Sequence, residues 1–310
     1  MSPLQQISAD TLQCFWESPR YLFLSSEVDP IIYYSHLLPT TATIILVIIL
    51  LLSRNKSLQT IQLTVISLLF IAYALLNVLL WSIIDPSQIM FYWTLTNYLE
   101  PLLYATVLYL VLSYGLKSDL SLRFKIFLGF LFLPILLFGP TDLNLAGYDY
   151  TNCDRLAVEG PLVTYIYALE LLFALWILIG SFVIYRKITD RQHKKSFLYL
   201  CAGSLLFLLA FSFGNIFGTF FQESLGEDAW IIGQYGFFGM PIFLGFIMYI
   251  IVKFKAFSTK IIGAQALVLT LWVLIGSLLF ITQSIQAQSI ALLTLVLISY
   301  FGFILVQNNY

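Results

Sequence analysis

Long apolar runs, separated by short stretches of charged or turn-forming residues, dominate the pattern along this chain. Most runs reach the roughly 20 residues that a helix needs to cross a bilayer. They are far longer than barrel strands and show no strict alternation, so the pattern predicts helices. We expect nine membrane spans, at about 31–53, 58–84, 89–116, 122–138, 161–185, 196–221, 231–252, 261–282 and 286–306.

Composition agrees with an all-α, polytopic transmembrane bundle. The 310 residues are 60% hydrophobic and 10% charged, whereas a soluble domain is about 25% charged. The net charge of −1 gives no reason to expect a nucleic-acid partner. Residues 1–30 lack the basic start and apolar core of a signal peptide, so we expect a polar extracytoplasmic segment there. Membrane lipid surrounds the remaining domain, 31–306, and no soluble catalytic domain is expected.

The loops between the expected spans alternate between basic and non-basic. Because cytoplasmic loops are enriched in Lys and Arg, the N-terminus is predicted outside the plasma membrane and the C-terminus in the cytoplasm. A re-entrant apolar run would break this alternation. The basic loops are "SRNKS", "LKSDLSLRFK", "YRKITDRQHKK" and "KFKAFSTK", and the long loop "TDLNLAGYDYTNCDRLAVEG" is acidic.

Two of the three cysteines, Cys14 and Cys153, fall outside the membrane in this topology. Disulfides persist in that compartment. We therefore expect a Cys14–Cys153 bond that ties the N-terminal segment to the long acidic loop. Two free thiols are the alternative.

Two glutamates interrupt apolar runs. Glu170 lies about 14 Å from the outer end of its span and Glu100 about 16 Å from the end of its own, at 1.5 Å per residue. An unpaired carboxylate in hydrocarbon costs on the order of 3 kcal/mol. Both side chains should therefore face the bundle interior, where they are protonated, hydrogen-bonded to polar neighbours or paired with a ligand cation.

Other polar and aromatic residues fall in the same outer half, and the inner half has no comparable set. Trp93, Asn97, Glu100 and Tyr104 share one helical face. This asymmetry predicts a cavity open to the outside that binds an unknown extracytoplasmic ligand. Amides and phenols between membrane helices also serve as packing contacts alone. His36 and His193 are expected to be solvated. The remaining pocket candidates are Asn77, Asn215, Gln234 and Tyr167.

The run at 231–252 carries glycines at three-residue spacing. Gly233, Gly236 and Gly239 allow a neighbouring backbone to approach closely, and Pro241 predicts a kink or hinge. "GNIFG" at 214–218 has the same small-residue character. Tight packing of the sixth and seventh spans follows, either as a static contact or with Gly236, Gly239 and Pro241 as a hinge.

Catalytic and cofactor signatures are missing from the sequence. It has no H-E-x-x-H, no Cys/His cluster with metal spacing, no P-loop and no G-x-G-x-x-G. We expect no metal, no cofactor and no enzymatic activity in this chain.

The stretches "EGPLVTYIYALELLFALWILIGSFVIYRK" and "YGFFGMPIFLGFIMYIIVKFKAFSTKIIGAQALVLTLWVLIGSLLF" carry a family resemblance. They resemble the membrane-embedded N-terminal sensor region of bacterial multi-pass histidine kinases, the seven-helix type. The resemblance implies a sensor core at 31–254, two further spans at 261–306, a homodimer or cytoplasmic signalling partner, and signal transfer through the last span. Histidine kinase activity of such a two-component system would lie beyond Tyr310.

These expectations favour a receptor-like sensory module that binds a small or lipidic ligand near Glu100 and Glu170. A transporter or channel for small molecules or ions is the alternative. No internal repeat of the kind common in transporters is evident. An intramembrane enzyme and a scaffolding subunit form a third class.

Overall fold

The computed structural model describes residues 19–20, 23–25, 28–52, 57–149, 156–225, 227–254, 271–272, 275–276, 279 and 285–307. Helices make up almost all of this part of the chain. In order, the elements are α1 (Pro30–Leu52), α2 (Leu58–Ser82), α3 (Pro86–Leu116), α4 (Leu122–Phe138), β1 (Leu145–Asp149), β2 (Leu156–Glu159), α5 (Pro161–Lys187), α6 (Arg191–Leu225), α7 (Glu227–Gly233), the 3-10 helix η4 (Gln234–Phe238), α8 (Gly239–Phe254) and α10 (Ile285–Gln307).

Eight of the nine expected runs are helical in this structure, and the other run, 261–282, lies largely outside the described residues. Within the described ranges, six helices are long and apolar enough to cross a membrane, which indicates a multi-pass membrane protein. Helix α4, with 17 residues, and the apolar part of α10, Gln288–Tyr300, are shorter. The count of nine spans and the orientation of the termini stay predictions. The expected Cys14–Cys153 bond also lies outside the described residues.

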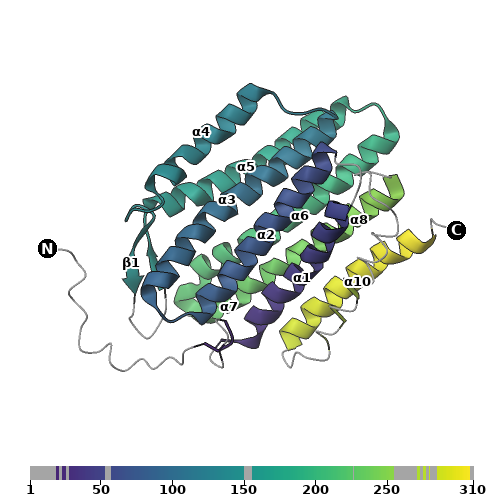
Figure 1. Ribbon diagram of the computed structural model, residues 1–310. Coiled ribbons are helices and arrows are strands. Elements are labelled where there is room, and N and C mark those ends of the chain that lie inside the picture. The colour runs from purple at the N-terminus through teal and green to yellow at the C-terminus, as the bar shows by residue number, and fades with distance from the viewer. Residues whose placement is uncertain are drawn as a thin grey trace, which may run out of the picture.

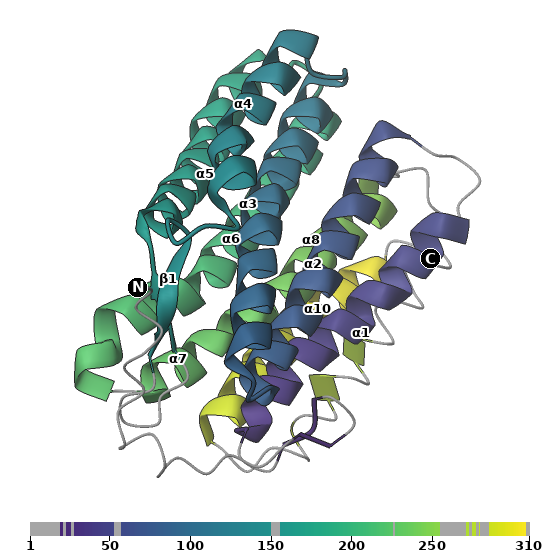
Figure 2. The ribbon, with the colours of Figure 1, turned by 60° about the vertical axis from the view of Figure 1, so that its left-hand side comes forward.

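Helix α3 occupies the middle of the bundle. It packs against α2, α5 and α6, while α6 also contacts α7, η4 and α8. Figure 1 shows α4 at one edge of the bundle and α10, in yellow, at the opposite edge. Helix α4 packs on α3 and α5, and α10 packs on α8. The helices run up and down, so the starts of α3 and α5 lie at the same end of the bundle (Figure 2).

Polar caps fix several helix boundaries. Asp85 precedes α3 and accepts hydrogen bonds from the backbone N–H groups of Ser87 (2.8 Å) and Gln88 (3.3 Å). Ser57 accepts from Thr60 N at 3.2 Å at the start of α2. Pro86 and Pro161 each open a helix at a position where the missing N–H costs no hydrogen bond. The first helical turns are therefore encoded locally.

A small β-hairpin interrupts the helical pattern and lies within the long acidic loop between the fourth and fifth expected spans. Strands β1 and β2 pair antiparallel, with Tyr148 opposite Ala157 and Leu145 opposite Glu159. We call the end of the bundle that carries this pair the hairpin end. The strands are five and four residues long, and so short a pair depends on packing against the helices for its stability.

The bundle is apolar both inside and outside. Its core contains fully buried aromatic side chains, among them Phe70, Phe173, Phe207 and Phe243. The outer face of α4 leaves Leu122 71% and Phe130 67% exposed. Soluble proteins rarely expose contiguous apolar patches of this kind, so the outer surface fits a lipid environment.

Candidate functional site

Glu100 and Glu170 come from the two central helices α3 and α5, and both are buried, each with 5% exposure. Their burial agrees with the expectation that a carboxylate in a membrane span faces the protein interior. The two carboxyl groups lie close enough for the charge of Glu100 to act on Glu170. Like charges at this depth repel each other, so the arrangement needs a proton, a hydrogen-bond donor or a bound cation to be stable.

Glu100 receives hydrogen bonds from two neighbouring helices. The Tyr73 hydroxyl of α2 donates to Oε2 at 3.3 Å, and the Asn215 amide of α6 donates to Oε1 at 3.0 Å. Three helices therefore meet at one carboxylate. Asn215 was a predicted pocket residue, whereas sequence reasoning missed Tyr73 because a single tyrosine in an aromatic-rich chain carries no distinctive signal.

Glu170 has fewer partners than Glu100. Its Oε1 atom is buried and has no hydrogen-bond partner among the described residues. One turn earlier on α5, the Tyr167 hydroxyl donates a 2.8 Å hydrogen bond to Glu159 Oε1 of β2, away from Glu170. Tyr167, a predicted pocket residue, thus lies on the same face of α5 as Glu170, while its hydroxyl bonds to Glu159.

The polar side chains that share the predicted face of α3 contact different parts of the structure. The Asn97 amide donates to Asn144 Oδ1 at 2.9 Å and so holds the hairpin segment. The Tyr104 hydroxyl bonds to Ser212 Oγ and donates to Leu208 O at 3.1 Å, both on α6. Glu100 is the member of this face whose hydrogen bonds belong to the carboxylate site. Trp93 is half-buried.

A second set of buried polar contacts involves His36. Its imidazole is fully buried, which shows that the expectation of a solvated histidine was wrong. Nδ1 lies 2.7 Å from Ile32 O, and the ring packs on Phe237 with a 3.9 Å separation of centroids. Asn77 approaches the same imidazole. Asn77 therefore lies beside His36, and within the described residues no hydrogen bond joins it to Glu100.

The seventh expected span is broken into α7, η4 and α8. Gly233, Gly236 and Gly239 all lie against the backbone or side chains of α6. A Cβ on Gly236 would collide with Ala210 O, and a Cβ on Gly233 would lie 2.7 Å from the Cα of Gly214. The predicted close approach is thus present, and it requires glycine.

The irregular turn of this span lies upstream of the predicted kink residue. Pro241 occupies the first turn of α8, where a missing N–H is best tolerated. Gln234, another predicted pocket residue, opens η4, is buried, and donates to Trp230 O at 3.0 Å. Its Oε1 is without a partner in the described part of the chain.

The opposite end of the bundle is more polar than the sequence predicted. A cavity of about 330 Å³ opens there, lined by Gln59, Tyr114, Lys117, Asp190, His193 and Ser196. Lys117 and Asp190 form an exposed ion pair at 3.7 Å. His193, expected to be solvated, is half-buried with Nε2 3.2 Å from Gly115 O. These residues lie at helix ends, so hydropathy patterns alone do not bring them together.

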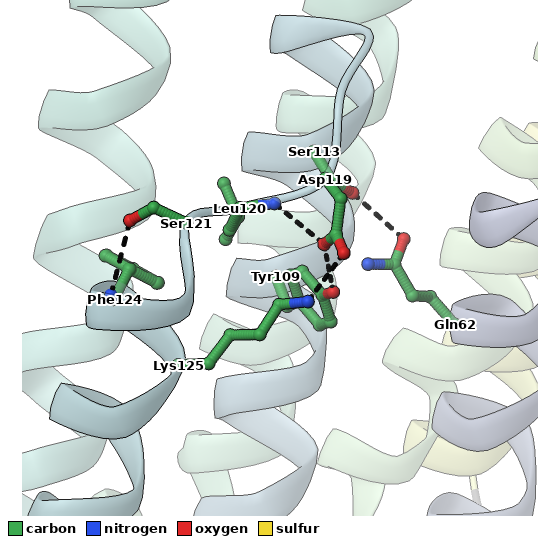
Figure 3. A network of polar contacts seen from close by, with 8 residues as sticks. All are labelled: Gln62, Tyr109, Ser113, Asp119, Leu120, Ser121, Phe124 and Lys125. Carbon is green, nitrogen blue, oxygen red and sulfur yellow. Dashed lines mark hydrogen bonds and ion pairs between the residues drawn. The ribbon is translucent and has the colours of Figure 1, made fainter.

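The turn from α3 to α4 carries a further polar network, shown in Figure 3. Asp119 accepts hydrogen bonds from Lys125 Nζ (2.5 Å), Leu120 N (2.7 Å) and the Tyr109 hydroxyl. The hydrogen bonds from Lys125 and Tyr109 lower the pKa of the Asp119 carboxyl below its usual value. This network fixes the turn and has no direct contact with the carboxylate pair.

Glu159 is a site residue that sequence reasoning did not select. Although its side chain is exposed at the surface, the protein atoms crowding its carboxyl raise its pKa, and the hydrogen bond from Tyr167 partly offsets that rise. Its charge acts on Glu100. An acidic loop residue gave no signal in the sequence, because only the hairpin brings it over the start of α5.

Metal binding finds no support in the described ranges, where no three His, Cys, Asp or Glu side chains gather in a group that could hold an ion. The cysteine that is described, Cys201, is buried with a free thiol 3.1 Å from Ser181 Oγ.

No family model, no curated protein and no solved structure matches this chain. The resemblance to the sensor region of histidine kinases therefore stays a prediction, and function has to be argued from the site itself.

Proposed function

We propose that this protein is a sensory membrane module that binds a small extracytoplasmic ligand at Glu100 and Glu170. One observation carries the proposal: Glu170 Oε1 is buried beside a second carboxylate and has no hydrogen-bond partner among the described residues. Leaving such a group unsatisfied costs about 1–3 kcal/mol. Buried ionisable residues within membrane spans are expensive and mark functional sites by default.

The loop charges support ligand entry from the extracytoplasmic side. The start of α6 contains "RQHKK", whereas the hairpin segment contains Asp142, Asp149 and Glu159. By the positive-inside rule, the hairpin end faces outward and the start of α6 faces the cytoplasm of a plasma-membrane protein.

The contacts of Glu100 offer a route from ligand to signal. Asn215 on α6 donates to this carboxylate, and α6 packs against η4 and α8. A ligand that competes for the Glu100 carboxylate alters the hydrogen bond that joins α3 to α6. To signal, that ligand must bind two arrangements of these helices with unequal affinity. The proposal includes transmission of the signal through a homodimer of this chain or to a cytoplasmic partner protein.

A small-molecule or ion transporter is the second candidate. The observation that favours it is the break at Gln234–Phe238 between α7 and α8. Discontinuous membrane helices often line the substrate sites of transporters. Helix α7 is only seven residues long, so this break lies near one end of the helix pair, whereas transporter sites lie near the bilayer midplane.

A ligand screen on purified protein in nanodiscs tests the site. Neutral, anionic and cationic small molecules are screened for saturable thermal stabilisation, which reaches about 2.7 kcal/mol at 100 times the dissociation constant. Glu100→Gln and Glu170→Gln should abolish the stabilisation by a hit, while the exposed control Asp142→Asn should leave it intact. The proposal is wrong if no molecule stabilises the protein, or if both site variants respond as the wild type does.

Flux measurements separate the two candidate functions. A hit is radiolabelled and its uptake into proteoliposomes is followed. Saturable binding without uptake supports a sensor, and uptake above that of empty liposomes supports the transporter.

Orientation needs its own test, made in a background without Cys14, Cys153 and Cys201. Gly147→Cys on β1 and Lys195→Cys on α6 are exposed to a membrane-impermeant maleimide applied to intact cells. Labelling at residue 147 alone supports the proposed orientation. Labelling at residue 195 alone reverses it and removes the basis for an extracytoplasmic ligand.

A further inference from the structure

The hairpin places a third carboxylate above the buried pair. Glu159 is the last residue of β2, and its Oε1 accepts a 2.8 Å hydrogen bond from Tyr167 of α5. Tyr167 lies three residues before Glu170, so the phenol and the carboxylate share one face of α5. The charges of all three carboxylates, Glu159, Glu100 and Glu170, act on the Tyr167 phenol.

Several hydrogen bonds hold Glu159 in this place. Asn144, which is 1% exposed, accepts from the Asn97 amide at 2.9 Å and donates to Gly139 O at 3.0 Å. Its backbone oxygen accepts from Gly160 N at 2.7 Å, directly after Glu159. A Cβ on Gly160 would collide with Leu143 O. The hairpin is therefore fixed to α3 and to the start of α5.

A series of acidic and phenolic side chains leads from the hairpin end to the middle of the bundle, and we call it the acidic path. It begins at the exposed Glu159 and passes Tyr167. It ends at Glu170 and Glu100, which are buried. Charged groups of one sign beside low-dielectric protein attract ions of the opposite sign. Glu170 Oε1, buried without a partner in the described part of the chain, is an acceptor at the end of this path.

We propose that the ligand of the Glu100–Glu170 site is an organic cation with an ammonium group, and that it enters past Glu159 and Tyr167. The inference rests on the proposed function and adds to it the chemical class of the ligand and an entry residue. Each of these three groups, when ionised, repels an anion and attracts a cation. An ammonium N–H donates a charge-assisted hydrogen bond to a carboxylate oxygen, so it satisfies Glu170 Oε1.

Two carbodiimides test the path, because they react with the same carboxyl groups and differ in charge. The water-soluble probe 1-ethyl-3-(3-dimethylaminopropyl)carbodiimide carries a protonated amine, whereas dicyclohexylcarbodiimide is neutral and enters from lipid. Adducts at Glu170 and Glu100 are quantified by peptide mass spectrometry on protein in nanodiscs. In the wild type, both reagents should label the pair.

Glu159→Gln is the decisive variant. We expect labelling of the pair by the cationic reagent to slow by about fivefold or more, as for loss of electrostatic steering. Labelling by the neutral reagent should stay unchanged, which also reports an intact fold. The effect should shrink in 1 M salt, where the Debye length is about 3 Å. Asp142→Asn is the matched control and should leave both rates unchanged.

Tyr167→Phe provides an independent check, since it removes the hydrogen bond to Glu159 and keeps the carboxylate. Cationic labelling at Glu170 should be retained or accelerated in this variant. The entry path is wrong if the cationic reagent labels the pair at the same rate in the wild type and in Glu159→Gln. It is also wrong if only the neutral reagent labels the wild type.

The proposed function has a separate criterion. It is wrong if the molecules found in the ligand screen stabilise Glu100→Gln and Glu170→Gln as they stabilise the wild type.

Discussion

The hydroxyl of Tyr73 donates a 3.3 Å hydrogen bond to Oε2 of Glu100, and the bond joins α2 to α3. The Tyr73 ring also stacks on Phe237 of η4, with centroids 5.8 Å apart. A single buried side chain thus contacts both the candidate ligand site and the irregular turn between α7 and α8. Tyr73 therefore provides a direct physical contact between the Glu100 carboxylate and η4.

Tyr73→Phe should destabilise the bundle modestly. The variant keeps the ring and removes one hydrogen bond, which is worth about 0.6 kcal/mol on average and up to about 1.7 between membrane helices. Unfolding in mixed micelles, followed by circular dichroism, measures the change in the free energy of unfolding. Tyr92→Phe, at a half-buried tyrosine near the start of α3, is the control and should be neutral. Equal stability of the two variants would show that the Tyr73 bond contributes nothing.

Asn144→Ala should loosen the hairpin without unfolding the helices. The substitution removes the bond from Asn97 and the bond to Gly139 O. Losing such buried partners costs about 1–3 kcal/mol. Hydrogen–deuterium exchange at the amides of Gly160 and Leu162, both bonded to residues 143–144, should accelerate by about tenfold. Thr94→Ala, which removes a bond within α3 only, should leave these amides unchanged.

Gly236→Ala should lower the free energy of unfolding by about 1–3 kcal/mol, the usual cost of overpacking a close contact. The reason is the Ala210 carbonyl oxygen, which occupies the space that a Cβ would need. Gly129→Ala on α4 is a matched control, because nothing lies within 4 Å of its Cβ position. There the helix propensity of alanine should raise the stability by about 0.5–1 kcal/mol. Chemical denaturation of both variants in the same micelles gives the comparison.

Asp119 should make stability depend on pH in the acidic range. The hydrogen bonds from Lys125 and Tyr109 lower its pKa in the folded protein, so its contribution is present above the unfolded pKa of about 3.9. That contribution is lost as the pH falls through the lowered folded pKa. The difference in unfolding midpoint between the wild type and Asp119→Asn should be constant above about pH 5 and shrink below about pH 4. A difference that grows on acidification would contradict the assigned network.

The sequence by itself determined that the surroundings of this protein are lipid and where its main helices lie. Runs of about 20 apolar residues have no stable alternative to a helix in lipid, because every backbone polar group needs a partner there. The same reasoning placed Glu100 and Glu170 inside the bundle, since hydrocarbon penalises a carboxylate wherever it occurs. Glycine spacing likewise predicted the close contact of Gly236 with α6, because a missing side chain is visible in the sequence.

Only the tertiary structure decided which polar groups meet. Asn97 and Glu100 share a helical face, yet one holds the hairpin and the other bonds to Tyr73 and Asn215. Helical periodicity predicts the direction in which a side chain points. It does not predict the hydrogen-bond partner, because the partner lies on another element whose position depends on tertiary packing. His36 and Glu159 show the same limit, since their environments depend on η4 and on β2, two elements with no signature in the hydropathy pattern.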